Sequence, residues 1–241
     1  MYLQTYSYRV PQSDRRFPRP VHYVDLCYEV ASDALAQAGV KPDTEDVMLI
    51  LSTTKGDNLY LYEPAAELAS RLHIRKSLVV TNACISGVAA QLAANRMMQH
   101  HDYILLVGCD LITPFIESGF TALHAVSEEP CRPFDRDRQG LNLGEAAAAM
   151  LLTSQPTRWK FISGSIHNDA NHITGPSRTG EGSYRCLMDL MSHTSSNTLA
   201  CVSVHGTGTL YNDEMESIAL YRAGLIDVPV CAFKGIYGHT L

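Results

Sequence analysis

The sequence lacks the features that would mark a membrane-spanning, secreted or nucleic-acid-binding protein. It has no run of roughly 18 to 20 apolar residues, the length that crosses a bilayer. Its opening, MYLQTYSYRV, has no basic region leading into an apolar region, as a signal peptide would. The formal net charge is −6, and no basic block offsets it. We therefore expect no membrane span and no binding of nucleic acid.

Paired cysteines are also missing. The seven cysteines are odd in number and scattered, and none forms a C-x-x-C pair. This usage favours reduced thiols in the cytoplasm over a disulfide scaffold.

The residues that are present describe an ordinary globular chain, with 46% hydrophobic and 18% charged residues over 241 positions. Such a chain buries a sizeable core in one large domain or two small ones. Apolar periodicity predicts helices over 21–38, 63–72, 85–99, 182–193 and 213–223, and strands over 47–52, 78–82, 103–108, 145–153, 161–166, 199–204 and 228–233. Gly39 stands where a glycine would end the first helix.

This alternation predicts an α/β fold. Strand 78–82, helix 85–99 and strand 103–108 form a βαβ unit, so part of the sheet is expected to be parallel. A polar connection with a proline, SQPTRW, follows residue 153. We expect it to separate two βαβ-rich halves, residues 1–153 and 154–241.

Chemically capable side chains follow three of the predicted strands. Cys84 follows the strand 78–82, His205 follows 199–204, and Lys234 and then His239 follow 228–233. Ligands of parallel α/β sheets bind outside the carboxyl ends of the strands. All four residues are therefore expected at the functional edge of the sheet.

Cys84 has two interpretations from its surroundings alone. Buried cysteine usually acts as a small hydrophobe. A helix is predicted directly after Cys84, however, and the N–H groups and positive dipole at its start would favour a thiolate. Cys84 with His205 and His239 would also suit zinc, but no two of them have the close spacing usual in zinc sites, so we expect no metal.

Four motifs in order along residues 78–241 resemble those of the β-ketoacyl-acyl carrier protein synthases, the condensing enzymes of fatty acid and polyketide synthesis. TNACISG resembles their nucleophile motif, and PFDRDRQGLNLGEAAAAMLL resembles PFDxxRDGFVxGEGA. VSVHGTGTLYNDEMES and KGIYGHTL resemble the first and second histidine motifs, the second being KSxxGHT. The resemblance implies the thiolase-like fold, two βαβ-rich halves layered α/β/α/β/α.

The resemblance also implies roles. Cys84 would carry the acyl chain as a thioester. His205 and His239 would hold the malonyl thioester carbonyl, promote decarboxylation and stabilise the enolate. Lys234 and Glu145 would support this polar site, and the lysine would help to keep the imidazoles neutral.

Further implications concern the partners. Thr207 and Thr209 would contact the pantetheine arm of the acyl carrier protein, and no cofactor is expected. Family members are dimers, and the resemblance places the pairing strand at YILLVG, residues 103–108. The partner would be a second copy or another ketosynthase subunit.

The sequence departs from the family pattern in several places. The usual first strand is expected to be absent before residue 20, and the chain ends directly after the second histidine motif. A GFGG-type loop that closes the core and supplies the second oxyanion N–H would follow there, so the second half is expected to be incomplete. Smaller departures are Asn82, Ala146, Leu210 and Gly235, which replace Thr, Gly, Pro and Ser.

Two other interpretations remain open beside an elongating enzyme. One is a non-catalytic partner subunit, like the chain-length factors that pair with active synthases; such partners typically lose the nucleophilic cysteine. The other is a truncated fragment whose sheet exposes an unpaired edge. Because the cysteine, the lysine and both histidines are present, the sequence favours the enzyme, with chain length and pathway left undetermined.

Overall fold

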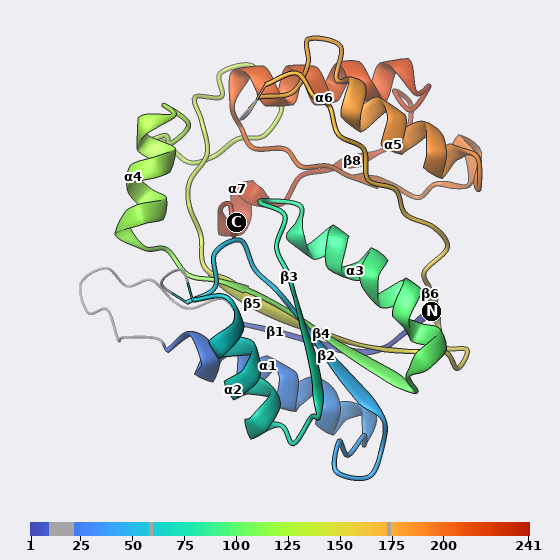
Figure 1. Cartoon of the computed structure of the whole chain (residues 1–241). Helices are drawn as coiled ribbons and strands as arrows, with labels where there is room; N and C mark the ends of the chain where they lie inside the picture. Colours follow the sequence, from blue (N-terminus) through green and yellow to red (C-terminus); the bar gives the residue numbers. More distant parts are fainter. Residues whose placement is uncertain (10–21, 58–59, 173–174) are drawn as a thin grey trace. The chain divides into compact units, whose positions relative to one another are not determined.

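A computed structural model describes residues 1–9, 22–57, 60–172 and 175–241 (Figure 1). The chain divides into two compact units. The first unit comprises Met1–Thr113, Gly144–Phe161 and Thr240–Leu241; the second comprises Pro114–Leu143 and Ile162–His239. The first unit contains Cys84 and Glu145, and the second contains both histidines and the lysine of the predicted site.

The first unit is built on a six-stranded mixed sheet with strand order β3-β2-β4-β5-β1-β6. The strands are β1 (Tyr2–Arg9), β2 (Val47–Ser52), β3 (Lys76–Val80), β4 (Tyr103–Asp110), β5 (Ala146–Thr153) and β6 (Trp159–Lys160). β2 pairs with β3 and with β4 in parallel, whereas β5 is antiparallel to β4 and to β1. The two strands of the predicted βαβ unit, β3 and β4, both lie in the parallel part of the sheet, with β2 between them.

Helices cover both faces of this sheet, α1 (Tyr23–Ala38) and α2 (Tyr62–Arg71) on one side and α3 (Ser86–Met97) on the other (Figure 1). β2 shows why. Leu49 and Leu51 lie in the core with α1 and α2, while Met48 and Ile50 lie in the core with α3. A continuous apolar strand is buried on both faces only when both are covered.

The second unit has little strand structure. It contains α4 (Pro114–Ala122), α5 (Glu181–Met191), α6 (Leu210–Arg222), the short α7 (Lys234–Tyr237), and the two-residue parallel strands β7 (Val202–Ser203) and β8 (Val230–Cys231). Its small core includes Leu220, Leu225 and Val228. β7 leads to the first histidine motif and β8 to the second.

Most predicted elements are confirmed to within a few residues. α1 ends at Gly39, whose φ of 70° is the left-handed conformation expected there. Two strand predictions were too long, because 199–204 and 228–233 reduce to the two residues of β7 and β8. The predicted strand 161–166 is wrong: those residues form no regular element, and the chain pairs at β6 instead.

The expected absence of a first strand was also wrong, because β1 pairs with β5 from Tyr2 to Arg9, with one register shift between Leu3 and Thr5. The face of β1 that contacts α1 is polar, so a search for apolar alternation does not detect this strand. Thr5 donates to the carbonyl of Ala34 at 2.6 Å, and Ser7 faces Asp33 of the same helix. α4 was not predicted either.

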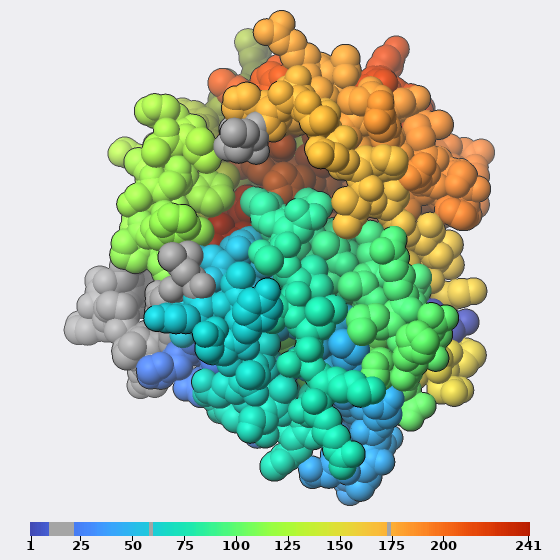
Figure 2. Space-filling view, viewed as in Figure 1, coloured from blue at the N-terminus to red at the C-terminus, as the bar shows by residue number. Residues whose placement is uncertain are grey.

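The strand named for dimer pairing needs a correction. β4, which contains YILLVG, is hydrogen-bonded to β2 on one side and β5 on the other, so it has no edge to offer. The edge next to the parallel strands is β3. β3 and α3 both reach the surface of the first unit (teal to green in Figure 2).

Residues 114–143 precede residue 153 in the chain and belong with the second compact unit. Among the described residues, no helix combines the length and the apolar character that a bilayer crossing requires.

Candidate functional site

Cys84 lies in a tight turn between β3 and α3. Ala83 before it has φ 45°, a left-handed conformation that costs a non-glycine residue about 1 kcal/mol or more. Ser86 fixes the turn, because its Oγ accepts the N–H of Asn82 at 2.8 Å and donates to the carbonyl of Ala83 at 2.6 Å. This conformation presents Cys84 at the surface of the first unit, just before the start of α3.

Cys84 differs from the buried cysteines in its exposure to solvent. Cys84 is exposed, whereas Cys27, Cys109 and Cys131 are buried. Burial raises the pKa of the Cys131 thiol, and a neighbouring thiol and burial raise that of Cys109. The buried cysteines act as small hydrophobes, while Cys84 has the access that a nucleophile requires.

In the second unit, Lys234 contacts His205 directly. The Lys234 ammonium donates to the His205 carbonyl at 2.6 Å and lies 3.3 Å from its Nδ1. An ammonium has only donors, so Nδ1 must accept and the imidazole must be neutral with its proton on Nε2. His205 therefore presents an N–H donor on the side of the ring away from Lys234.

His239 is the second imidazole of this cluster. Its ring centroid lies 5.4 Å from that of His205 in an edge-on arrangement and 5.7 Å from the Phe120 ring. The residue is 2% exposed, and its backbone N–H donates to the carbonyl of Asn142 at 2.7 Å. The structure thus brings together three of the predicted site residues, His205, His239 and Lys234.

Burial and charge keep both rings neutral. Burial, with the Lys234 charge, lowers the pKa of His205 to about 4. Burial, the His205 ring and Lys234 lower the pKa of His239 to about 3. Two neutral N–H donors side by side can stabilise an oxygen that becomes negative during a reaction.

We expect these two histidines to make the folded chain less stable in mild acid. In the folded state they stay neutral to about pH 4 and 3, whereas in the unfolded chain they take up protons near pH 6.5. The unfolded state then binds more protons, so the free energy of unfolding falls as pH drops from about 6.5 and levels off below the folded pKa values. Urea unfolding at pH 7 and pH 5 measures this, and His239→Gln should show a smaller loss than the unmodified chain. Equal losses in the two proteins would contradict it.

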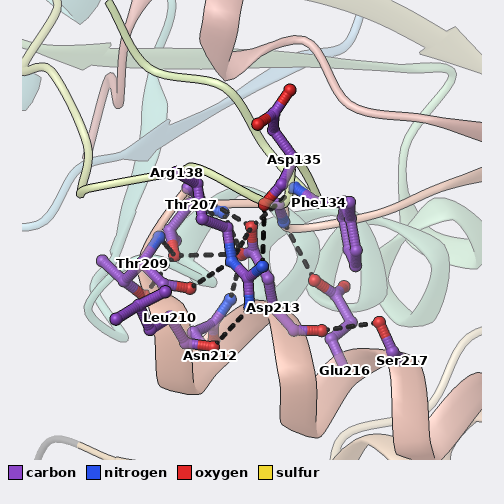
Figure 3. Close-up of polar contacts among 12 residues, drawn as sticks. Phe134, Asp135, Arg138, Thr207, Thr209, Leu210, Asn212, Asp213, Glu216 and Ser217 are labelled. Carbon is purple, nitrogen blue, oxygen red and sulfur yellow. Dashed lines mark hydrogen bonds and ion pairs between the residues drawn. The ribbon is translucent and has the colours of Figure 1, made fainter. Parts of the chain in front are cut away.

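The loop that carries His205 is held by two carboxylates of α6 that the sequence analysis did not identify (Figure 3). Glu216 accepts the backbone N–H groups of His205 at 2.7 Å and Gly206 at 2.9 Å. Asp213 accepts those of Thr207 at 2.9 Å and Gly208 at 3.1 Å. Asp213 and Glu216 are three positions apart in the chain, so both lie on one side of the helix. This spacing is the sequence feature that could have identified them.

Both glycines of this loop are required by its shape. Gly206 and Gly208 have φ of 49° and 75°. A Cβ on Gly208 would lie 2.7 Å from the carbonyl oxygen of Gly140 and 2.8 Å from the sulfur of Cys131. The HGTGT sequence is therefore needed for backbone conformation and for close contact with residues 131–140.

Replacing Asp213 with alanine is expected to destabilise the second unit by about 3–5 kcal/mol, because removal of this fully buried carboxylate leaves its buried partners unpaired. Besides the loop, it accepts the N–H of Phe134 at 2.9 Å and pairs with Arg138 at 3.6 Å. Urea or thermal unfolding checks this. Glu214→Ala, at the exposed neighbour, should change stability by no more than about 0.5 kcal/mol; similar losses in both variants would refute the assignment.

The remaining predicted site residues lie as follows. The hydroxyls of Thr207 and Thr209 are 2.8 Å apart and bond to each other, and Thr207 is buried. Glu145 belongs to the first unit, where its Oε1 accepts the N–H of Ile112 at 2.7 Å. Cys84 and the histidine cluster lie in different units and follow strands of different sheets, not one common sheet edge. No group of three potential metal ligands occurs among the residues that the structure describes.

Comparison with family models decides the classification. The model "Beta-ketoacyl synthase, N-terminal domain" matches residues 64–157, and "Beta-ketoacyl synthase, C-terminal domain" matches residues 161–241. The chain belongs to the β-ketoacyl synthase family. The four motifs identified in the sequence lie within these two matches.

Curated relatives of this chain include nodulation protein E of Rhizobium leguminosarum bv. trifolii, 32% identical over 178 residues. Another is 3-oxoacyl-[acyl-carrier-protein] synthase 2 of Rhizobium meliloti, 30% identical over 185 residues. Each match covers 67% of this chain and 44% of the relative. The chain thus spans less than half the length of these relatives.

Solved structures show the same fold. The ketosynthase ApeO in complex with its chain length factor ApeC, from Xenorhabdus doucetiae, matches with a TM-score of 0.80 and 23% identity over 98% of this chain and 72% of that chain. The ishigamide ketosynthase/chain length factor matches with a TM-score of 0.82 and 20% identity over 99% of this chain and 81% of that chain. The thiolase-like fold implied by the motifs is confirmed.

Proposed function

We propose that the protein is a β-ketoacyl-acyl carrier protein synthase. The thiolate of Cys84 attacks an acyl-carrier protein thioester, which forms an acyl-Cys84 thioester and releases the carrier thiol. Malonyl-carrier protein then loses CO₂ to give an enolate, and the enolate carbon attacks the acyl-Cys84 carbonyl. A 3-oxoacyl-carrier protein leaves, and the Cys84 thiolate is restored.

The observation that carries this proposal is the pair of neutral imidazoles beside a lysine. Decarboxylation places negative charge on the thioester oxygen of malonyl. The N–H groups of two neutral imidazoles can donate hydrogen bonds to that oxygen and stabilise the charge. Burial and the Lys234 charge lower the pKa of His205, and burial, the His205 ring and Lys234 lower that of His239, so both rings are neutral. Relatives named 3-oxoacyl-[acyl-carrier-protein] synthases agree with this chemistry. We further propose that Glu145 supports this polar site and that Thr207 and Thr209 contact the pantetheine arm of the carrier protein.

The partners follow from the same reaction. The substrates would be acyl and malonyl thioesters of acyl carrier protein, with no cofactor, in the cytoplasm where seven thiols stay reduced. A second copy or another ketosynthase subunit would pair with this chain, and we propose β3 as the pairing strand because it is the edge of the parallel part of the sheet. Solved ketosynthases in complex with a chain length factor agree with such pairing. We also propose that the boundary between the two halves of the fold lies near residue 153.

The test has two steps. The purified chain is first incubated with acyl-carrier proteins of several chain lengths and its intact mass is read; a gain of one acyl group supports the first half-reaction. Malonyl-carrier protein is then added, and CO₂ and 3-oxoacyl-carrier protein are measured. A folded chain that takes no acyl group, alone or with a ketosynthase partner, would refute the enzyme and favour the non-catalytic partner subunit.

A further inference from the structure

The side chain of Asn142 makes an unusual number of backbone contacts. Its Oδ1 accepts the N–H of Cys131 at 2.7 Å. Its Nδ2 donates to the carbonyls of Ser127 at 3.0 Å and Glu129 at 3.1 Å. One amide group therefore binds three backbone groups of a single five-residue stretch.

These partners require an amide. The acceptor faces an N–H, and both donors face carbonyl oxygens, so the orientation of the Asn142 side chain follows from its neighbours. A carboxylate of the same shape would keep the bond to Cys131 and set negative oxygen against the carbonyls of Ser127 and Glu129. No other side chain of this size offers one acceptor and two donors.

The backbone of Asn142 binds the second catalytic histidine. Its carbonyl accepts the N–H of His239 at 2.7 Å, and the next residue, Leu143, forms a β-bridge with His239. The position of residue 142 therefore sets the position of the His239 backbone, from which the buried ring extends.

The stretch that the side chain holds contacts the first histidine loop. The Cys131 thiol donates to the carbonyl of Thr207 at 3.3 Å, and its sulfur lies where a Cβ on Gly208 would be only 2.8 Å away. A Cβ on Gly235, the residue after Lys234, would likewise lie 2.8 Å from the Cys131 carbonyl oxygen. The loop of His205, through Thr207 and Gly208, and the start of α7 at Lys234, through Gly235, thus both contact the segment that Asn142 holds.

We propose that Asn142 is a positioning residue that ties His239 to the HGTGT loop, so that the two imidazoles keep the relative placement needed for decarboxylation. This inference rests on the proposed function for its catalytic meaning. The contacts themselves lie within the second unit and do not depend on it. Asn142 does not touch the reacting atoms; it acts through His239 and Cys131.

The test compares Asn142→Asp with Asn168→Asp. Asn168 lies on the exposed surface of the same unit, and its Oδ1 accepts the N–H of Ala170 at 2.9 Å, a bond that aspartate preserves. We expect Asn142→Asp to slow malonyl decarboxylation by roughly 10- to 100-fold, the cost of an ångström-scale misplacement. Acylation of Cys84 should change less than about twofold, because the contacts of Asn142 do not include the first unit's nucleophile turn. Asn168→Asp should change neither rate. Equal slowing of both half-reactions, or none, would overturn the proposal.

A second readout is independent of catalysis. NMR titration of His239 is expected to show its pKa near 3 in the unmodified chain and in Asn168→Asp, and moved toward 6.5 in Asn142→Asp. Should Asn142→Asp fail to fold by circular dichroism, Asn142→Ala, which removes the bonds without adding charge, takes its place. An inactive unmodified chain whose His239 still responds to Asn142 would refute the proposed function and leave the tie intact. An unchanged His239 titration would refute the tie itself.

Discussion

Cys84→Ala is expected to abolish acyl transfer: no acyl mass appears on the chain, and product formation falls by about 10⁶-fold, the loss seen when a covalent nucleophile is removed. Cys84 is exposed in a turn fixed by Ser86 and precedes the start of α3, so alanine removes the reacting sulfur with little structural effect. Intact-mass spectrometry after incubation with acyl-carrier protein measures this directly. A wild-type rate in the variant would exclude Cys84 as the nucleophile.

The matched control for this experiment is Cys201→Ala. Cys201 is the other exposed cysteine among the described residues, so it tests whether accessibility alone leads to labelling. We expect Cys201→Ala to take one acyl group as the unmodified chain does. An acyl mass that survives in Cys84→Ala and disappears in Cys201→Ala would transfer the assignment to Cys201.

His205→Ala and His239→Ala are expected to lower the rate of condensation by about 10²- to 10³-fold each, the loss typical of removing one hydrogen-bond donor to a developing oxyanion. Acylation of Cys84 should persist in both variants, because the step that needs both imidazoles is the decarboxylation of malonyl. Loading of the chain by mass and release of CO₂ separate the two steps.

Two further variants sharpen this experiment. The double replacement should lose less than the product of the single losses, because the two rings, 5.4 Å apart, act on one group. His193→Ala, at an exposed histidine of the same unit, should leave both steps unchanged. Loss of Cys84 acylation in the His239 variant would show that the histidines act in acyl transfer instead.

The helices and buried strands of the first unit follow from local pattern. β2 and β4 are apolar because both faces are covered, and α1 has helical periodicity and a glycine at its end. The local sequence pattern did not predict the elements that depend on tertiary contacts. β1 has a polar inward face that is satisfied by α1, and residues 161–166 have apolar residues but form no strand. β7 and β8 keep only two paired residues each.

For the site, the sequence by itself determined which chemical groups are present and in what order. Cys84, His205, Lys234 and His239 each follow a strand, and the motifs around them identified the family. The sequence did not show which backbone groups Asp213, Glu216 and Asn142 bind, because each bond links a side chain to the backbone of a residue in another segment.

The tertiary structure alone decided the state of the histidines. Whether an imidazole is neutral depends on its burial and on the distance to nearby charge, and neither quantity can be read from residue type or spacing. Lys234 is 29 residues from His205 in the chain, yet its ammonium lies 3.3 Å from the His205 ring. That contact and the burial of His239 arise only when the strands and loops have folded together, because they depend on which segments meet and on how much water is excluded between them.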